Sequence, residues 1–275
     1  MISGYTKIIA HIGVPTEGFI SPMIYNPWFE SKGIDTVVIP FGCEEKDYRD
    51  FLKSVFRLRN IVGALITMPH KIETIKLVDQ ISITAKICGA CNAVRKHSNG
   101  KLIGDMFDGE GFTQGVLSLG RSINGKNALV VGNGGAGSAI AASLAQKDLK
   151  KLGLFDVKTR ASELLASKLR KYYPQLDIEL SCEDPRGWDI IVNASPVGMK
   201  KDDPLPIDFN AISSSTLVGD AVLNKYETNF IRKAKKKGCP TQTGIQMLLH
   251  QIPSYLDFFG FPAATPKELL SLAKI

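Results

Sequence analysis

A glycine-rich turn near the middle of the chain constrains its fold more than any other segment. The run Ala128-Leu-Val-Val-Gly132-Asn-Gly134-Gly-Ala-Gly137 joins a short apolar stretch to closely spaced glycines. The first glycine can adopt a positive φ and turn the chain, the second leaves room beside a pyrophosphate, and the third lets the next helix pack against the strand. We predict that N–H groups at the start of this helix bind phosphate. The residues concerned are Gly132, Asn133, Gly134, Gly135 and Ala136.

The surroundings of this turn support a dinucleotide-binding unit. An alanine-rich segment at 138–149 follows with helical spacing, and a second apolar run at 151–155 stops at Asp156. This is about the separation at which such a motif carries the acid that binds ribose. Strand, turn, helix, strand and acid therefore occur in order, which favours nucleotide binding over a chance glycine loop.

Length and composition favour a soluble α/β protein. The 275 residues fit two modest domains or one large domain. The first residues lack the basic patch and apolar stretch of a signal peptide, and no apolar run approaches the roughly 20 residues that span a bilayer. Five cysteines, an odd number without repeated spacing, favour reduced thiols in the cytoplasm over a disulfide framework.

The charged, cysteine and histidine residues predict neither a nucleic-acid site nor a metal site. The net charge of +7 is diffuse and would favour anionic cofactors and substrates. Its densest run, at 232–237, precedes Gly238 without interleaved aromatic residues, which indicates a helix end. Cys88 and Cys91 have the spacing of a redox pair, but no second pair follows, so we interpret them as structural. None of the histidines has metal-ligand spacing: His11, His70, His97 and His250.

Apolar runs alternate with amphipathic segments, a pattern typical of βαβ units and a mostly parallel sheet. In the first part we predict strands at 7–12, 36–40 and 63–67, with helices at 22–32, 48–57 and 73–80. After a helix at 107–119 and a polar junction at 120–127, we predict strands at 128–131, 153–155, 189–193 and 216–220. The segment 243–259 is apolar at helical spacing, so we expect a buried helix that returns to the first domain.

Lys71 and Asp108 are two charged residues that could have a functional role. The segment Thr67-Met-Pro-His-Lys71 comes directly after a predicted strand, and its proline ends the strand and forces a loop. Taken alone, Lys71 would be a surface lysine and Asp108 a helix N-cap. Their place in the order of motifs changes this interpretation.

The whole series of motifs resembles the shikimate dehydrogenase family over nearly the full chain. The Pro-His-Lys string and the Asn-Ala-Ser-Pro-Val-Gly-Met string are specific, and their joint order is more so. In chain order the matching segments are Gly13-Val-Pro15, Ser21-Pro22, Asn26, Thr67–Lys71, Gly89-Ala-Cys-Asn92, Asp108 with Gly111-Phe112, Gly132-Asn-Gly-Gly-Ala136, Asn193–Met199, Asp220, and Gly244 with Met247-Leu and Gln251.

This resemblance implies two α/β domains with a cleft between them. A substrate domain of residues 1–107 would be completed by C-terminal helices of residues 242–275, and a Rossmann domain would span 108–241. It also implies an oxidoreductase of aromatic amino acid biosynthesis that transfers a hydride between NAD(P) and a ring secondary alcohol. Shikimate, 3-dehydroshikimate or a related cyclic polyol acid would be the substrate. The alternative is a non-catalytic nucleotide or metabolite sensor that keeps the fold.

Residue by residue, the resemblance implies that Lys71 and Asp108 are catalytic. An amine held between the substrate hydroxyl and a carboxylate can shuttle the hydroxyl proton. The carboxylate also favours the charged amine, so Lys71 acts either as a base or as an electrostatic anchor. Retention of both residues favours an enzyme over a sensor. The resemblance further assigns Ser21, Thr67, Asn92 and Gln251 to the substrate, and Asn193, Ser195 and Gly244 to the cofactor.

Apolar residues stand where the family has polar groups in the substrate pocket. Phe19 replaces one of two serines that receive the substrate carboxylate, and Leu223 replaces a tyrosine at the same end. Leu65 replaces an asparagine, and Phe107 and Ala93 replace threonines. We therefore expect a drier pocket that binds the carboxylate less well, so that shikimate is a poor substrate or not the true one.

The residue at the end of the second nucleotide-binding strand favours NAD. Asp156 stands where NADP-using members commonly carry an Asn-Arg-Ser/Thr string, and a carboxylate accepts from both ribose hydroxyls while repelling a 2′-phosphate. Lys158 and Arg160 could neutralise a phosphate, so NADP is the alternative. We expect a small-molecule substrate as the partner, neither nucleic acid nor membrane, and a monomer or homodimer.

Overall fold

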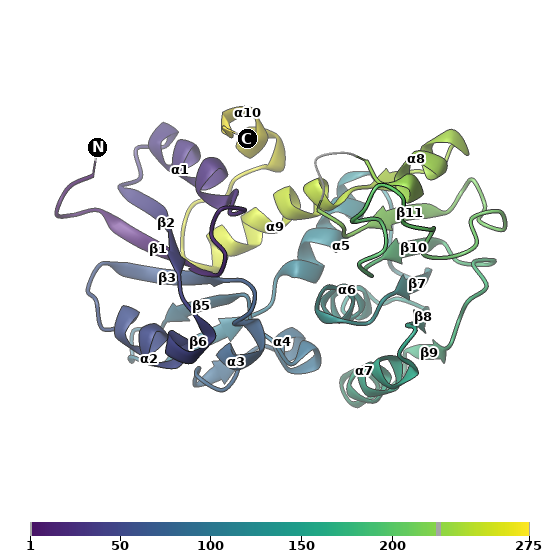
Figure 1. Cartoon of the computed structure of the whole chain (residues 1–275), viewed down its shortest axis with the longest axis horizontal. Helices are drawn as coiled ribbons and strands as arrows, with labels where there is room; N and C mark the ends of the chain where they lie inside the picture. Colours follow the sequence, from purple (N-terminus) through teal and green to yellow (C-terminus); the bar gives the residue numbers. More distant parts are fainter. Residues whose placement is uncertain (1, 224–226, 275) are drawn as a thin grey trace. The chain divides into compact units, whose positions relative to one another are not determined.

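The chain folds into two compact units. The computed structural model describes residues 2–223 and 227–274. One unit comprises Met1–Phe107 with Ile252–Ile275, and the other comprises Asp108–Gln251. The sequence placed the second boundary at 241/242, whereas here it falls inside a C-terminal helix. Each unit is an α/β structure, so the predicted fold class is confirmed (Figure 1).

The first unit is built on a mixed sheet of six strands in the order β2-β1-β3-β5-β6-β4. Strands β2, β1 and β3 run parallel to one another, and β5 runs antiparallel to both β3 and β6. The carboxyl ends of β1 and β3 therefore meet at one edge, where the predicted substrate residues follow. The strands are β1 (Lys7–Gly13), β2 (Thr36–Gly42), β3 (Ile61–Ile66), β4 (Gln80–Ile81), β5 (Ala93–Lys96) and β6 (Leu102–Asp105).

Helices pack on both faces of this sheet. On one face, Ala10 and Ile12 of β1 pack against Tyr48 and Leu52 of α2. On the other face, Phe259 follows α9 and comes so close to β3 that a Cβ on Gly63 would lie 2.3 Å from its ring. The helices of this unit are α1 (Ser21–Ser31), α2 (Glu45–Val55), α3 (Lys71–Thr74), α4 (Ile83–Cys88), α10 (Pro266–Leu272) and the end of α9 (Gly244–Phe258).

The predicted helix at 73–80 is wrong. Helix α3 ends at Thr74, and the chain continues through a turn into the short strand β4. The Asp79 carboxylate accepts a hydrogen bond from the Leu102 N–H at 2.7 Å, which ties this segment to β6. Pairing with β6 stabilises an extended backbone there, and tertiary contacts of this kind override local helix propensity.

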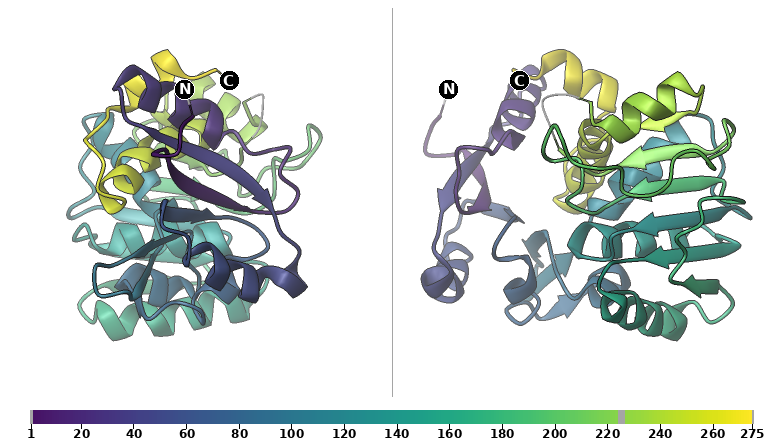
Figure 2. Two further views of the ribbon diagram at one scale, coloured as in Figure 1. Left: turned by 90° about the vertical axis from the view of Figure 1, so that its left-hand side faces the viewer. Right: turned by 45° about the vertical axis from the view of Figure 1, so that its right-hand side comes forward.

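The second unit contains a fully parallel sheet, with strand order β12-β11-β10-β7-β8-β9 (Figure 2). The order reverses between β7 and β10, and ligands of open α/β sheets bind outside the carboxyl ends of strands at such a point. The strands are β7 (Asn127–Val131), β8 (Lys151–Phe155), β9 (Asp177–Leu180), β10 (Ile190–Asn193), β11 (Leu217–Asp220) and β12 (Thr241–Gln242).

Helices α5 and α8 pack on opposite faces of this sheet. Phe112 of α5 lies against Gly219 of β11, while Phe230 and Ile231 of α8 join the apolar cluster on the other face. The basic run ends α8 as predicted, because Gly238 follows with φ +82°. The helices are α5 (Asp108–Ser118), α6 (Gly135–Ala145), α7 (Thr159–Tyr172), α8 (Asn229–Lys236) and the first part of α9.

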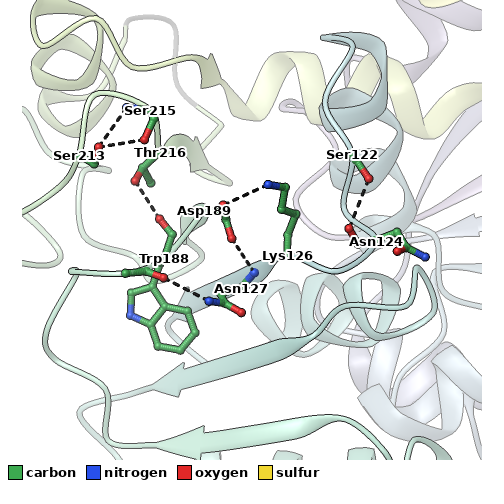
Figure 3. A network of polar contacts seen from close by, with 10 residues as sticks. Ser122, Asn124, Lys126, Asn127, Trp188, Asp189, Ser213, Ser215 and Thr216 are labelled. Carbon is green, nitrogen blue, oxygen red and sulfur yellow. Dashed lines mark hydrogen bonds and ion pairs between the residues drawn. The ribbon is translucent and has the colours of Figure 1, made fainter.

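A polar network joins the amino ends of the central strands of this sheet (Figure 3). The Asp189 carboxylate accepts from the Asn127 N–H at 2.9 Å and from Lys126 Nζ at 3.3 Å. Thr216 Oγ1 donates to the Trp188 carbonyl at 2.8 Å. The network fixes β7, β10 and β11 at the ends away from the glycine turn, so we assign it a structural role. Within the described ranges, no helix is both long enough and apolar enough to cross a membrane.

Candidate active site

Lys71 is the first residue of α3, and the residues around it are firmly held. The preceding His70 stacks on Tyr48 with ring centroids 3.9 Å apart, and its Nε2 lies 2.8 Å from the Cys43 carbonyl oxygen. Thr74 Oγ1 donates to the His70 carbonyl at 2.8 Å. The Lys71 carbonyl itself accepts from the Cys91 N–H at 2.9 Å. The backbone that carries the Lys71 amine is therefore rigid, as a positioned catalytic group requires.

Asn92 and Thr67 lie on the segments next to Lys71 in the same unit. Asn92 is buried, and its Oδ1 accepts from the Phe107 N–H at 2.9 Å, which fixes the backbone directly before Asp108. Thr67 follows β3, and its N–H donates to the Ile12 carbonyl at 3.0 Å. Ser21 is the half-buried first residue of α1. The predicted substrate residues of this unit thus lie at the ends of its elements: Thr67 directly follows β3, Asn92 directly precedes β5, and Ser21 begins α1.

Phe19 and Leu65, two of the apolar replacements, lie beside His11, a residue for which the sequence predicts no function. The rings of Phe19 and His11 stack with centroids 4.0 Å apart and an interplanar angle of 20°. His11 lies opposite Leu65 in the pairing of β1 with β3, and Leu65 lies opposite Ala93 in the pairing of β3 with β5. Paired positions point to the same face of a sheet. These side chains therefore form one group.

Phe107 takes part in a different contact. Its ring packs edge-on against Tyr255 and Phe258 of α9, with centroids 5.0 and 5.3 Å away. A threonine at this position would lack these aromatic contacts. The replacement at Phe107 is therefore explained by packing within the unit.

In the second unit, two predicted site residues from distant parts of the chain are in contact. Asp108 begins α5, and its Oδ1 accepts a hydrogen bond from Gln251 Nε2 at 2.8 Å. Close approach of the two helices requires a glycine, since a Cβ on Gly111 would lie 2.3 Å from the Met247 carbonyl oxygen. The Gly111 and Met247 of the motif list thus bring Asp108 and Gln251 together.

The glycine turn has the backbone geometry that the sequence predicts. Gly132 has φ +90°, and a Cβ there would lie 2.5 Å from the Ser195 N atom. A Cβ on Gly137 would lie 1.8 Å from the Gly132 carbonyl oxygen. By contrast, Gly134 and Gly135 are exposed and have no atom within 4 Å of a Cβ position. The N–H groups at the start of α6, where Ala136 follows these two glycines, are therefore accessible to a ligand, as phosphate binding requires.

Asp156 supports this turn directly. Its Oδ2 accepts from the Asn133 N–H at 2.7 Å, and its Oδ1 accepts from the Lys158 N–H at 2.8 Å. The Asn133 side chain is buried and accepts from Ser162 Oγ at 2.7 Å, so it holds the turn from inside. The exposed Arg160 lies 3.5 Å from the Glu163 carboxylate. The sequence identified Asp156 but gave no sign of these bonds.

The Asn-Ala-Ser-Pro-Val-Gly-Met segment forms a tight loop after β10. Asn193 is fully buried, and its Oδ1 accepts from Ser195 Oγ at 2.6 Å while its Nδ2 donates to the Val197 carbonyl at 2.8 Å. Nδ2 also donates to Asp220 Oδ1 at 3.1 Å. Burial raises the pKa of Asp220, and bonds from Thr228, Val222 and Asn193 oppose this shift. Asn193 and Ser195 thus shape the loop against Gly132.

Gly244 begins α9, and a Cβ there would lie 2.4 Å from the Val222 carbonyl oxygen. This glycine allows α9 to start directly beside the loop that follows β11. Leu223 lies on that loop, next to the end of the described segment, and its side chain is 56% exposed. No polar side chain occupies this position.

Comparisons with known proteins agree with these observations. A sequence profile described as the shikimate dehydrogenase substrate binding domain matches residues 12–94. The chain is 34% identical over 259 residues to the shikimate dehydrogenase (NADP(+)) of Methanococcus maripaludis strain C6, covering 91% of this chain and 90% of that protein.

Solved structures of similar proteins cover nearly the whole chain. Shikimate 5-dehydrogenase from Listeria monocytogenes, in complex with shikimate and NAD, has a TM-score of 0.92 at 25% identity and covers 98% of this chain and 97% of that one. The Thermus thermophilus shikimate 5-dehydrogenase, in complex with NADP(H) and shikimate, has a TM-score of 0.85 at 26% identity, covering 98% and 99%.

A mixed α/β unit followed by a Rossmann unit defines a class of two-domain, nucleotide-dependent oxidoreductases. Within that class, the chain belongs to the shikimate dehydrogenase family.

Proposed function

We propose that this chain transfers a hydride between NAD(P) and a ring secondary alcohol. The unit with Lys71 would bind the substrate, and the unit with the glycine turn would bind the nucleotide. The observation that carries the proposal is the 2.8 Å bond between Asp108 and Gln251, because it joins the family's catalytic acid to a family residue that holds ring hydroxyls. A protein that had lost this chemistry would not need both groups in contact.

The proposed roles follow from the chemistry of alcohol oxidation. Lys71 accepts or donates the hydroxyl proton, or anchors the developing charge on the oxygen. We assign to Asp108 the carboxylate that this proton transfer needs, and Gln251 orients that carboxylate by donating to its Oδ1. Thr67, Asn92 and Ser21 supply the polar groups of the first unit toward the substrate. When bound, the nicotinamide supplies the hydride acceptor or donor.

The second unit fits a dinucleotide. The open space over Gly134 and Gly135 lies at the N-terminus of α6, where N–H groups and the helix dipole favour phosphate. Asn133, Asn193 and Ser195 use their side chains to hold the backbone, so we assign them to shaping the site.

We further propose NAD as the preferred nucleotide. The Asp156 carboxylate accepts two backbone N–H bonds and keeps lone pairs for ribose hydroxyls, while its charge repels a 2′-phosphate. The Glu163 carboxylate lies beside Arg160 and offsets one of the two nearby cations. Against this stands the name of the Methanococcus relative, which specifies NADP(+).

The substrate pocket is predicted to bind a carboxylate weakly. Phe19, Leu65 and Leu223 offer no hydrogen-bond donor, and loss of a donor to a buried charged group costs on the order of 2–3 kcal/mol. This corresponds to about 30-fold or more in affinity for each donor. Shikimate would then be a poor substrate, and robust turnover at a sub-millimolar KM would contradict this part of the proposal.

The proposal is tested with a panel of ring alcohols and both nucleotides, following absorbance of the reduced nicotinamide. Lys71→Ala should lower kcat by about 100-fold or more. Lys53→Ala is the matched control, because Lys53 is an exposed lysine in the last turn of α2. If no ring alcohol is oxidised, or if Lys71→Ala turns over like the unmodified protein, the sensor hypothesis is favoured instead.

A further inference from the structure

His11 is a buried titratable residue to which the proposed chemistry gives no role. Its side chain is 8% exposed, and among the described residues no group forms a hydrogen bond with its Nδ1. A buried polar atom without a partner costs on the order of 1–3 kcal/mol, so its persistence calls for an explanation. An apolar side chain at this buried position of β1 would leave no polar atom without a partner.

The surroundings of His11 place it among the substrate residues of the first unit. Its ring stacks on Phe19 at 4.0 Å, and a Cβ on Gly13 would lie 3.0 Å from Phe19 Cζ and 2.4 Å from Thr67 Cγ2. His11 and Phe19 thus lie beside Thr67 at the carboxyl ends of β1 and β3. The positive charge of Lys71 also acts on His11.

The imidazole of His11 is uncharged at neutral pH. Burial, and secondarily the charge of Lys71, lowers the pKa of His11 to about 4. A neutral imidazole has one N–H donor and one lone-pair acceptor, which suits a hydroxyl that both donates and accepts. It supplies no charge to a carboxylate. The apolar rings and chains of Phe19 and Leu65 on either side supply none either.

We infer that His11 is a specificity-determining residue which, with Phe19, selects an uncharged ring polyol over a ring carboxylic acid. The inference rests on the proposed function and specifies its substrate class. His11 would bind a substrate hydroxyl, and Phe19 would cover the apolar face of the ring. A carboxylate at this place would be buried beside Phe19 and Leu65 with too few donors, which is costly.

A pair of substrates that differ only in charge tests the inference. Shikimate and its methyl ester share the ring and its hydroxyls, so the ratio of their kcat/KM values isolates the response to the carboxylate. We expect the unmodified protein to prefer the ester by about tenfold or more. We expect Phe19→Ser to move the ratio toward the acid by about tenfold, since it restores a donor.

Variants at His11 separate recognition from folding. His11→Leu should raise KM for the ester by about tenfold with little change in kcat, and His11→Gln, which keeps a donor and an acceptor, should recover part of this loss. The matched control is His97→Leu, because His97 is exposed in the turn after β5 and should leave both constants unchanged. The 15N resonances of the His11 imidazole should shift on addition of the ester without protonation of the ring.

The outcomes separate this inference from the function on which it rests. The inference is overturned, and hydride transfer is left standing, if the unmodified protein prefers the acid, if Phe19→Ser leaves the ratio unchanged, or if His11→Leu leaves KM for the ester unchanged. If neither compound is turned over but another ring alcohol of the panel is, the inference is overturned and the proposed function stands. If no ring alcohol is turned over with either nucleotide, the proposed function is contradicted and the inference falls with it.

Discussion

The side-chain amide of Gln251 donates a hydrogen bond to the Asp108 carboxylate at 2.8 Å, although 143 positions separate the two residues in the chain. The contact depends on Gly111, which lets α5 approach α9, so the fold itself brings the two polar groups together. A carboxylate held in this way has a fixed direction, which is a requirement for positioning an amine during proton transfer.

Asp108→Asn should therefore lower kcat by about 100-fold or more while leaving the unfolding temperature nearly unchanged. Asparagine keeps an oxygen that accepts from Gln251 Nε2 but removes the negative charge. Steady-state kinetics and thermal unfolding of the same preparations measure both effects. A variant with full kcat would show that the Asp108 charge does not take part in the reaction.

Asp156→Ser should shift nucleotide preference toward NADP, with the ratio of kcat/KM for NADP over NAD rising by about tenfold. The carboxylate lies directly against the glycine turn, because it accepts from the Asn133 N–H at 2.7 Å. Its removal also loosens the turn, but that effect acts on both nucleotides and cancels in the ratio. An unchanged ratio would remove the argument for NAD.

The sequence predicts those parts of the fold that local patterns determine. The strand, glycine turn and helix at 128–149 have a local cause, because apolar runs, positive φ at Gly132 and alanine-rich spacing all act within a few residues. The basic run before Gly238 is a helix end for the same reason. By contrast, the segment after Thr74 depends on β6, a partner more than twenty positions away, and local propensity predicts it wrongly.

In the candidate site, too, local motifs predict some features, and others depend on contacts between distant segments. The motif series identifies Lys71, Asp108 and Gln251, and the structure adds what holds them. No local pattern indicates that His11 stacks on Phe19, because that contact requires β1 and the loop after it to fold back together. Nor does any pattern indicate that both oxygens of Asp156 accept backbone N–H bonds.

Gly137→Ala should destabilise the protein by about 3 kcal/mol or more, because its Cβ would lie 1.8 Å from the Gly132 carbonyl oxygen and backbone would have to move. Gly135→Ala is the matched control in the same helix, since its Cβ would have no atom within 4 Å. That variant should unfold within about 0.5 kcal/mol of the unmodified protein. Urea unfolding of the two variants without nucleotide measures the difference, and equal stabilities would contradict the close packing at Gly137.

The free energy of unfolding should decrease on acidification, and part of this decrease should be due to His11. The pKa of His11 is lowered from 6.5 to about 4 in the folded chain, so between these values the unfolded chain binds a proton that the folded chain does not. Stability is therefore lost as the pH falls from about 7, and between about pH 7 and pH 4.5 the loss due to His11 amounts to roughly 2–3 kcal/mol. Burial is the larger cause of this shift, and the charge of Lys71 is the second. His11→Leu should lack this part of the pH dependence, whereas His97→Leu, at an exposed position, should retain it. Urea unfolding of the three proteins at both pH values measures the difference, and identical pH dependence in all three would mean that folding does not lower the pKa of His11.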